Sequence, residues 1–343
     1  MDSKELVYRA LSFEEIPRTP YSIDFTVPAL ERLRSSAAGK SLYEALENDV
    51  VLTPVIRVEW GTRDSRGSYR DEFGQEWDRR IDPDIGIPKP FVTPETLATT
   101  RLPDPKVPGR FDGLKHNLAT HPERFHLLAM DFSLYERAWA MRGLESFYLD
   151  MAERPEFVQS LLDRILDFNL CVIEEGLRQC PTIDGVHFGD DFGDQVGVPM
   201  GAERWRTLIK PRLARQYGLV KAAGKKVSIH SCGNVLQILD DLVEIGVDLF
   251  NPFQPEVMDV ETVLRRFRGR LSFWGGISTQ RLLPFAQPQE VTRRVEELIA
   301  LGRAGGYVVA PAHAVPADAT ERNMHAMLRA LMGQKQLART GAR

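Results

Sequence analysis

The sequence places two histidines and a cysteine where they could hold a divalent metal ion. His230 and Cys232 lie two residues apart, directly after the apolar run KVSI. In an extended segment, residues two apart point the same way, so this imidazole and this thiol would face one centre. Zinc prefers nitrogen and sulfur ligands in a tetrahedron, and a catalytic zinc site uses three protein ligands. His313, after the run YVVAP, is the best-placed third ligand.

A purely structural interpretation of these residues stays open at this point. Cys232 could be a buried thiol beside a capping histidine, and His313 could be a loop histidine that hydrogen-bonds a carbonyl. The other cysteines, Cys171 and Cys180, fall on or at the end of an expected helix. They are typical of core or helix-end residues and are poorer candidates for the third ligand.

Three carboxylates, Asp190, Asp191 and Asp194, follow the apolar run GVHFG. Like charges this close raise one another's pKa, which suits general acid–base work or pairing with a cation. The alternative is a solvated loop that caps the following helix, because aspartate is a good N-cap residue.

Amide and aromatic side chains follow two further apolar runs. Asn251 and Gln254 lie around Pro252, and Trp274 precedes a pair of glycines. They could supply hydrogen bonds and a stacking wall for a small organic ligand. Turn and core roles explain the same residues equally well.

These candidates stand at the ends of short apolar runs that we expect to be buried strands. The runs cover residues 126–130, 185–189, 226–230, 248–253, 271–276 and 307–311, with Tyr21–Phe25 and Val51–Val58 upstream. Stretches of helical length lie between and after them: Pro155–Arg178, Ala202–Ala223, Val235–Ile245, Asp259–Phe267, Gln289–Leu301 and Thr320–Met332. Such alternation predicts βαβ units and a parallel sheet.

Eight strands favour an α/β fold of the (β/α)₈ TIM-barrel type over an open sheet. We expect one domain over residues 1–343, with regular βα units over 125–332. Residues 59–124 are rich in proline and charge, which predicts an irregular N-terminal insertion that covers the mouth formed by the strand ends. Chemistry in such a barrel takes place at that mouth.

Composition excludes several classes of protein. The 343 residues carry 44 basic and 48 acidic side chains, a net charge of −4, which argues against nucleic-acid and anionic-membrane binding. No apolar run reaches the roughly 18 residues of a membrane span, and the charged start lacks the apolar stretch of a signal peptide. With only three cysteines, the chain is expected to be soluble, reduced and cytoplasmic.

Taken together, the strand-end residues resemble the uroporphyrinogen decarboxylase superfamily. Their order is H-x-C-G-N, GVD-x-x-NP-x-Q, a GG pair after an aromatic residue, and then GG-Y-x-x-x-P-x-H. Within that superfamily the chain is most similar to the zinc-dependent methyltransferases that act with methylcobamides. The resemblance extends from about Phe125 to Leu331 and implies a (β/α)₈ barrel, which among the decarboxylases is usually a homodimer.

The chain departs from both branches of the superfamily. In the methyltransferases, zinc is held by the His and Cys of H-x-C and by a later cysteine in a P-G-C motif. His230 and Cys232 match the first two, and His313 would have to replace the third. The decarboxylases carry an arginine-rich motif near the start, whereas the matching region here, RTPYSIDFTVPAL, offers only Arg18 and contains Asp24. The decarboxylase histidine near the last strand corresponds to His313.

The ligand set predicts the chemistry. Two histidines and one thiolate leave zinc net positive, which makes it a better Lewis acid for an oxygen or nitrogen leaving group. We expect zinc on His230, Cys232 and His313 to polarise a methylated substrate, such as an aryl methyl ether, while a reduced corrinoid takes the methyl group. Asp191 would be the acid or would orient a ligand. The expected pocket residues are Asp190, Gln195, Asn251, Gln254 and Trp274.

The corrinoid is expected to arrive on a partner. Cobalamin-binding modules carry a D-x-H-x-x-G loop, and the nearest string, residues 184–189, has the wrong spacing. A separate corrinoid protein would therefore dock on the strand-end face. Two alternatives remain: a lyase related to uroporphyrinogen decarboxylase that works without metal, and a non-catalytic barrel that binds a small molecule.

Overall fold

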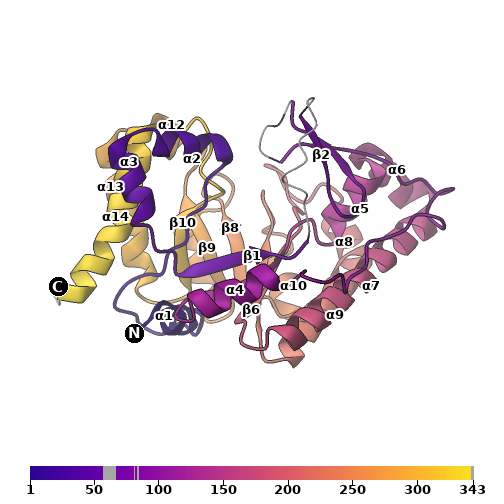
Figure 1. The fold of residues 1–343 in the computed structure, drawn as a ribbon, viewed down its shortest axis with the longest axis horizontal. Coiled ribbons are helices and arrows are strands. Elements are labelled where there is room, and N and C mark those ends of the chain that lie inside the picture. Colours follow the sequence, from indigo (N-terminus) through magenta and orange to yellow (C-terminus); the bar gives the residue numbers. More distant parts are fainter. Residues whose placement is uncertain (57–66, 81, 83–84, 341–343) are drawn as a thin grey trace.

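A curled parallel sheet forms the centre of the computed structural model, which describes residues 1–56, 67–80, 82 and 85–340 (Figure 1). Its seven strands follow one another in chain order. They are β1 (Val50–Pro54), β5 (Phe125–Met130), β6 (Gly185–Gly189), β7 (Lys226–His230), β8 (Leu249–Phe253), β9 (Ser272–Ile277) and β10 (Tyr307–Pro311). Because the strands are parallel, their carboxyl ends meet on one face of the molecule.

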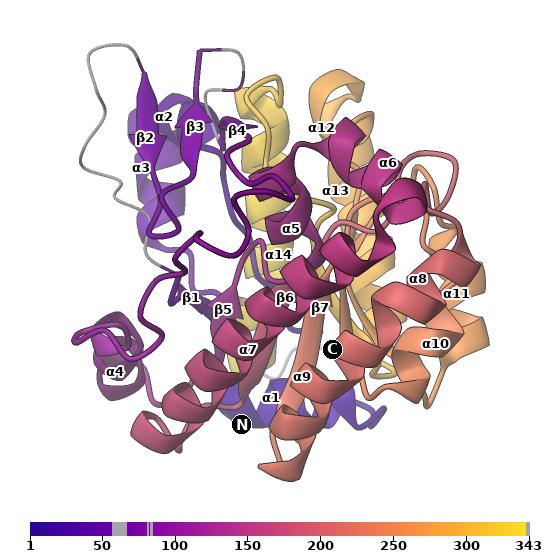
Figure 2. The ribbon, with the colours of Figure 1, turned by 90° about the vertical axis from the view of Figure 1, so that its right-hand side faces the viewer.

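The strands are buried on both faces because helices cover the outside and side chains fill the inside. Every residue of β5, β6, β9 and β10 is buried, as expected of parallel strands. Figure 2 shows α7 (Pro155–Gln179) and α9 (Lys210–Ala222) side by side on this outer layer. The lower inside is closed by α1 (Ser3–Leu11), whose Val7 and Leu11 pack against Phe125 and Val308.

The remaining helices complete the outer layer and the loops. They are α2 (Val27–Arg34), α3 (Ala37–Glu44), α4 (Asp112–Thr120), α5 (Tyr135–Arg142), α6 (Leu144–Glu153), α8 (Ala202–Leu208), α10 (Leu239–Glu244), α11 (Val260–Phe267), α12 (Leu282–Phe285), α13 (Pro288–Gly302) and α14 (Glu321–Thr340). In the part of the chain that the structure describes, none of these helices has the length and apolar character needed to cross a membrane.

The segment expected to be the first strand, Tyr21–Phe25, makes only isolated bridges, to Val309 and Val315. It nevertheless lies between β10 and β1: the Val309 amide donates to the Pro20 carbonyl (2.9 Å), and the Asp49 amide donates to the Tyr21 carbonyl (2.9 Å). Side chains explain the missing ladder, because Asp49 and Asn48 accept the amide hydrogens of Tyr21 and Ile23. The fold is thus TIM-barrel-like, with seven regular strands and one irregular closing segment.

The proline-rich insertion is more regular than its composition predicts. Within the described part of residues 59–124, a small antiparallel sheet joins β2 (Ser68–Arg70), β3 (Glu76–Asp78) and β4 (Ile87–Lys89), and α4 follows. Trp77 packs on Phe132, just after β5 (ring centroids 4.8 Å), and Asp71 pairs with buried Arg137 of α5. The insertion therefore sits beside the strand-end mouth. Residues 59–66, and residues 57–58 of the expected strand Val51–Val58, lie outside the described residues.

Two helix boundaries differ from the sequence prediction. The single helix expected over Ala202–Ala223 is split into α8 and α9, because Pro211 lacks the amide hydrogen that would continue the first helix. The helix expected over Val235–Ile245 begins only at Leu239. Its first residues form a turn in which the Asn234 side chain accepts the Leu236 amide (3.2 Å).

Gly233 holds the loop after β7 in a conformation that only glycine adopts easily. Its φ is +85°, and a Cβ there would lie 2.4 Å from the Gly193 carbonyl carbon. Its amide donates to Gln254 Oε1 (2.5 Å), which ties this loop to the end of β8. The backbone of Cys232 is therefore fixed by its neighbour.

We predict that Gly233→Ala lowers the free energy of unfolding by about 2 kcal/mol or more. The alanine would be held in a left-handed backbone conformation, and its Cβ would overlap the backbone of Gly193. Gly218→Ala is the matched control, since Gly218 lies inside α9 and a Cβ there meets nothing within 4 Å. The control is expected to be neutral or to stabilise the chain by up to about 1 kcal/mol. Urea unfolding measures the stability of both variants. Equal stabilities would contradict the close approach of Gly233 to the Gly193 backbone.

Candidate metal centre

The structure brings His230, Cys232 and His313 together at the strand-end mouth. One ligand atom from each lies within 4.8 Å of the other two. Cys232 Sγ is 3.4 Å from His230 Nε2. This is close to the distance of about 3.6 Å between a nitrogen and a sulfur ligand of tetrahedral zinc. All three side chains are partly exposed, so an ion and a small substrate could reach them.

A second layer of hydrogen bonds fixes the orientation of His230. Asn251 Nδ2 donates to the Trp274 carbonyl (3.1 Å), which turns Oδ1 toward His230 Nδ1 (2.7 Å). Because Oδ1 can only accept, Nδ1 carries the proton and Nε2 keeps its lone pair. A hydrogen bond at the far ring nitrogen is the usual partner of a metal-binding histidine.

Asp191 lies against the same cluster. Its Oδ1 accepts the Cys232 amide (2.7 Å) and stands 3.7 Å from His230 Nε2. Close packing around the thiol, with the carboxylates of Asp191 and Glu136 nearby, raises the pKa of Cys232 above its ordinary value. The thiol of the metal-free protein therefore stays protonated, and a bound cation would favour its thiolate.

Two further carboxylates adjoin the cluster, and neither was among the sequence candidates. Glu136 of α5 is only 8% exposed, and burial, reinforced by Asp191 and Asp190, raises its pKa well above the ordinary value. Asp131 directly follows β5 and interacts electrostatically with His230. Its strand-end position was the available signal, whereas Glu136 lies on a helix that the sequence analysis did not identify.

Asp190 is placed differently from the sequence expectation. It is fully buried, and its oxygens accept the Ser133 hydroxyl (2.6 Å) and the amides of Leu134 and Glu136. The carboxylate thus anchors the chain leading into α5, and the structure does not bring it to the surface of the cluster. Burial raises the pKa of Asp190 to about 7, although these hydrogen bonds oppose the rise.

The other expected pocket residues occupy three different positions. Gln254 and His313 line one open cavity of about 400 Å³ at the mouth. Trp274 points into the barrel, where its ring lies 5.7 Å from that of His187. Gln195 is exposed on the loop after β6 and makes no hydrogen bond to the cluster among the described residues.

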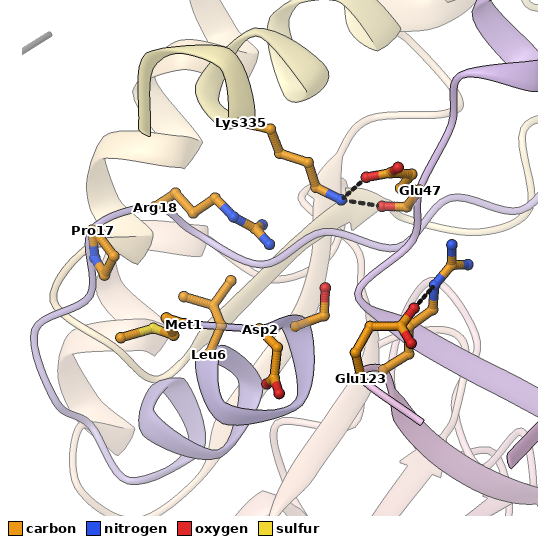
Figure 3. Close-up of a pocket in the computed structure, with 10 residues that line it drawn as sticks. Met1, Asp2, Leu6, Pro17, Arg18, Glu47, Glu123 and Lys335 are labelled. Atoms are coloured by element: carbon orange, nitrogen blue, oxygen red, sulfur yellow. Dashed lines mark hydrogen bonds and ion pairs between the residues drawn. The ribbon is translucent and has the colours of Figure 1, made fainter. Parts of the chain in front are cut away.

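A larger cavity, of about 550 Å³, lies at the opposite end of the barrel (Figure 3). It is lined by residues that precede strands, including Arg18 and Glu47, and by Lys335 of α14. Lys335 donates to the Glu47 carbonyl (2.6 Å), and Arg18 makes a two-point ion pair with buried Asp49. Its principal cations are therefore engaged in holding the chain together, and the strand-end cluster remains the candidate for chemistry.

The sequence matches the family described as Uroporphyrinogen decarboxylase (URO-D) over residues 74–333, most of the chain. The chain belongs to the URO-D family. Among solved structures, this URO-D family chain is similar to a methyltransferase from Methanosarcina mazei, at 15% identity and a TM-score of 0.67, over 97% of this chain and 99% of that one. This likeness confirms the fold expected from the sequence.

A second solved structure is only loosely similar. It is a native Bacteroidetes-affiliated GH5 cellulase linked with a polysaccharide utilization locus, at 10% identity and a TM-score of 0.43, over 96% of this URO-D family chain and 93% of that chain. A likeness at this level carries no argument about the site. No curated protein matches the sequence.

The raised pKa of Asp190 predicts a pH-dependent stability. An unfolded aspartate releases its proton near pH 4, whereas folded Asp190 keeps it up to about pH 7. Between about pH 4 and pH 7, Asp190 therefore carries a proton in the folded state that it lacks in the unfolded state. The contribution of Asp190 to the free energy of unfolding falls as the pH rises through this range. Asp190→Asn should flatten this fall. The variant should also lose roughly 1–3 kcal/mol at pH 5, because the amide cannot accept all three donors.

Urea unfolding at pH 5 and pH 7.5, with chelator present, measures the effect. Asp167→Asn is the matched control, because Asp167 is an exposed carboxylate on α7. A pH dependence that is the same in wild type and in Asp190→Asn would contradict the proton assignment.

Proposed function

We propose that this URO-D family protein is a zinc-dependent methyltransferase that moves a methyl group between a small methylated substrate and a corrinoid. The observation that carries the proposal is the convergence of His230, Cys232 and His313 at the mouth of the barrel. The similar fold of a methyltransferase from Methanosarcina mazei agrees with it. The substrate class that fits best is an aryl methyl ether.

The donor set fits zinc and favours an oxygen leaving group. Nitrogen and sulfur ligands suit zinc better than magnesium or calcium, which take oxygen ligands. Two neutral imidazoles and one thiolate give a bound Zn²⁺ centre a formal charge of +1. When bound, zinc supplies Lewis-acid polarisation of the substrate's ether oxygen.

The chain's own residues position the reactants and the proton. Asn251 holds His230 so that its Nε2 lone pair faces the cluster. Asp191 is 37% exposed and is fixed by the Cys232 amide, so its carboxyl group can hold a proton beside the departing oxygen. The nearby carboxylates of Glu136 and Asp131 disfavour an additional negative charge, which favours release of a neutral alcohol or phenol over an anion.

We propose that the methyl acceptor is a reduced corrinoid carried by a separate protein. The strand-end face carries exposed apolar side chains that such a partner could cover. Val196, after β6, is 87% exposed, and Phe285, in α12 beside the cavity that contains His313, is 78% exposed. Exposed apolar groups around a reactive site are typical of a docking surface.

The proposal predicts that the purified protein binds about one zinc ion per chain and that Cys232→Ala loses it, since a vacant ligand position weakens a three-ligand site. Cys171→Ala is the matched control, because Cys171 is a partly exposed cysteine on α7. Elemental analysis after gel filtration measures the zinc content. Equal zinc in Cys232→Ala and wild type would reject the site.

The reaction itself is tested with 2-methoxyphenol as donor and free reduced cobalamin as acceptor. We expect methylcobalamin to appear in the visible spectrum, to fall at least about 100-fold after chelation, and to return when zinc is added. Absence of methylcobalamin, together with chelator-resistant release of carbon dioxide from a porphyrinogen, would instead establish the metal-free lyase.

A further inference from the structure

Near the end of β1, the barrel side of the strand is more exposed than the helix side. The strand's outward-facing Thr53 is only 6% exposed and accepts a hydrogen bond from Asn117 of α4. Its inward-facing neighbour Leu52, on the same side as core residue Val50, is 37% exposed. β1 therefore presents an exposed apolar side chain toward the barrel side, close to the strand-end mouth.

His187 is a buried histidine that lines the inside of the barrel. It pairs in register with Ala129 on one side and Ser228 on the other, and its ring lies between Trp274 (centroids 5.7 Å apart) and His230 (6.3 Å). The residue is only 2% exposed. Its Nδ1 meets the Ser228 hydroxyl at 2.8 Å, and its Nε2 has no hydrogen-bond partner among the described residues.

The hydrogen bond to Ser228 determines which ring nitrogen carries the proton. Ser228 is 1% exposed, and its hydroxyl has no other partner among the residues described. If Nδ1 donated, the serine proton would be buried and unpaired, at a cost of about 1–3 kcal/mol. The serine therefore donates to Nδ1, and the proton of the neutral ring is on Nε2. Among the described residues, Nε2 has no acceptor and is not completely buried, so its N–H is available to a ligand.

We propose that His187 is a specificity-determining residue whose Nε2–H binds an acceptor oxygen of a small, mainly apolar substrate inside the barrel. The inference deepens the proposed function, on which it rests, by placing the substrate between Leu52, Trp274 and His187, below the metal-binding cluster. An aryl ether matches these surroundings. Its ring is apolar and flat, and its oxygen accepts a hydrogen bond without donating one.

The same arrangement discriminates against molecules that lack the oxygen. A buried donor that goes unpaired when a hydrocarbon binds makes that complex weaker than the complex with an ether of the same shape. Methoxybenzene and ethylbenzene are such a pair, because a methylene group replaces the oxygen. On chelator-treated protein, where no zinc can bind the ether oxygen, their relative affinity isolates the contribution of His187 from general apolar binding.

Isothermal titration calorimetry with these two ligands tests the proposal on zinc-loaded and on chelator-treated full-length protein. We expect wild type to bind methoxybenzene about 3- to 10-fold more tightly than ethylbenzene. His187→Phe should remove this preference while it retains affinity for ethylbenzene, and His187→Gln, which keeps a donor, should restore part of it. His126→Phe replaces a buried histidine that faces away from the barrel interior and should leave the preference unchanged.

A preference that survives in His187→Phe, or wild-type protein that binds neither ligand, would overturn the proposal. Circular dichroism and zinc content, measured on every variant, show whether a change comes from misfolding or metal loss. If the protein binds no zinc and transfers no methyl group, yet shows the preference and loses it in His187→Phe, the proposed function fails and the role of His187 stands. If methyl transfer occurs and the preference is absent, the reverse holds.

Discussion

The site depends on the curl of the parallel sheet. Strands β7 and β10 are separated by β8 and β9, so in a flat sheet their ends would lie about 14 Å apart. The candidate ligand atoms of His230 and His313 instead lie within 4.8 Å of each other, because the sheet closes and its side chains reach across the mouth. The segment Tyr21–Phe25 completes this closure, and the buried carboxylate of Asp49 holds it through Arg18 and the Tyr21 amide.

The electrostatics around the cluster favour a cation. Asp191 and Glu136 lie near a thiol that, without a positive charge, remains protonated, and Asp131 interacts with the adjacent His230. Arg137 of the neighbouring helix is already paired with Asp71. A divalent ion would neutralise part of this charge and allow Cys232 to bind as a thiolate. The carboxylates and the ligand set thus point to the same occupant.

The sequence was sufficient where chemistry follows directly from a strand end. The H-x-C spacing and the position after YVVAP identified residues that the structure brings together, because parallel strands all present their carboxyl ends to one face. The alternating strands and helices after Phe125 could also be predicted, because buried strands and amphipathic helices have distinct hydrophobic patterns.

What the sequence missed depends on contacts between distant segments. Asp190 looks like a loop residue, and only the approach of the Ser133–Glu136 segment makes it a buried anchor. Glu136 lies on a helix whose pattern was weak, and the proline-rich segment forms strands because Trp77 and Asp71 pack against residues after β5. His187 lies in the strand segment GVHFG. Which of its ring nitrogens carries the proton depends on the hydrogen bond to Ser228 of the next strand, and sequence spacing does not predict that contact.

Zinc K-edge X-ray absorption of the metal-loaded protein tests the central claim most directly, because it counts the sulfur and nitrogen atoms around the ion. Convergence of His230, Cys232 and His313 predicts one sulfur at about 2.3 Å and two imidazole nitrogens at about 2.0–2.1 Å, with a light atom in the open position. A spectrum without sulfur, or with two sulfurs, would contradict it.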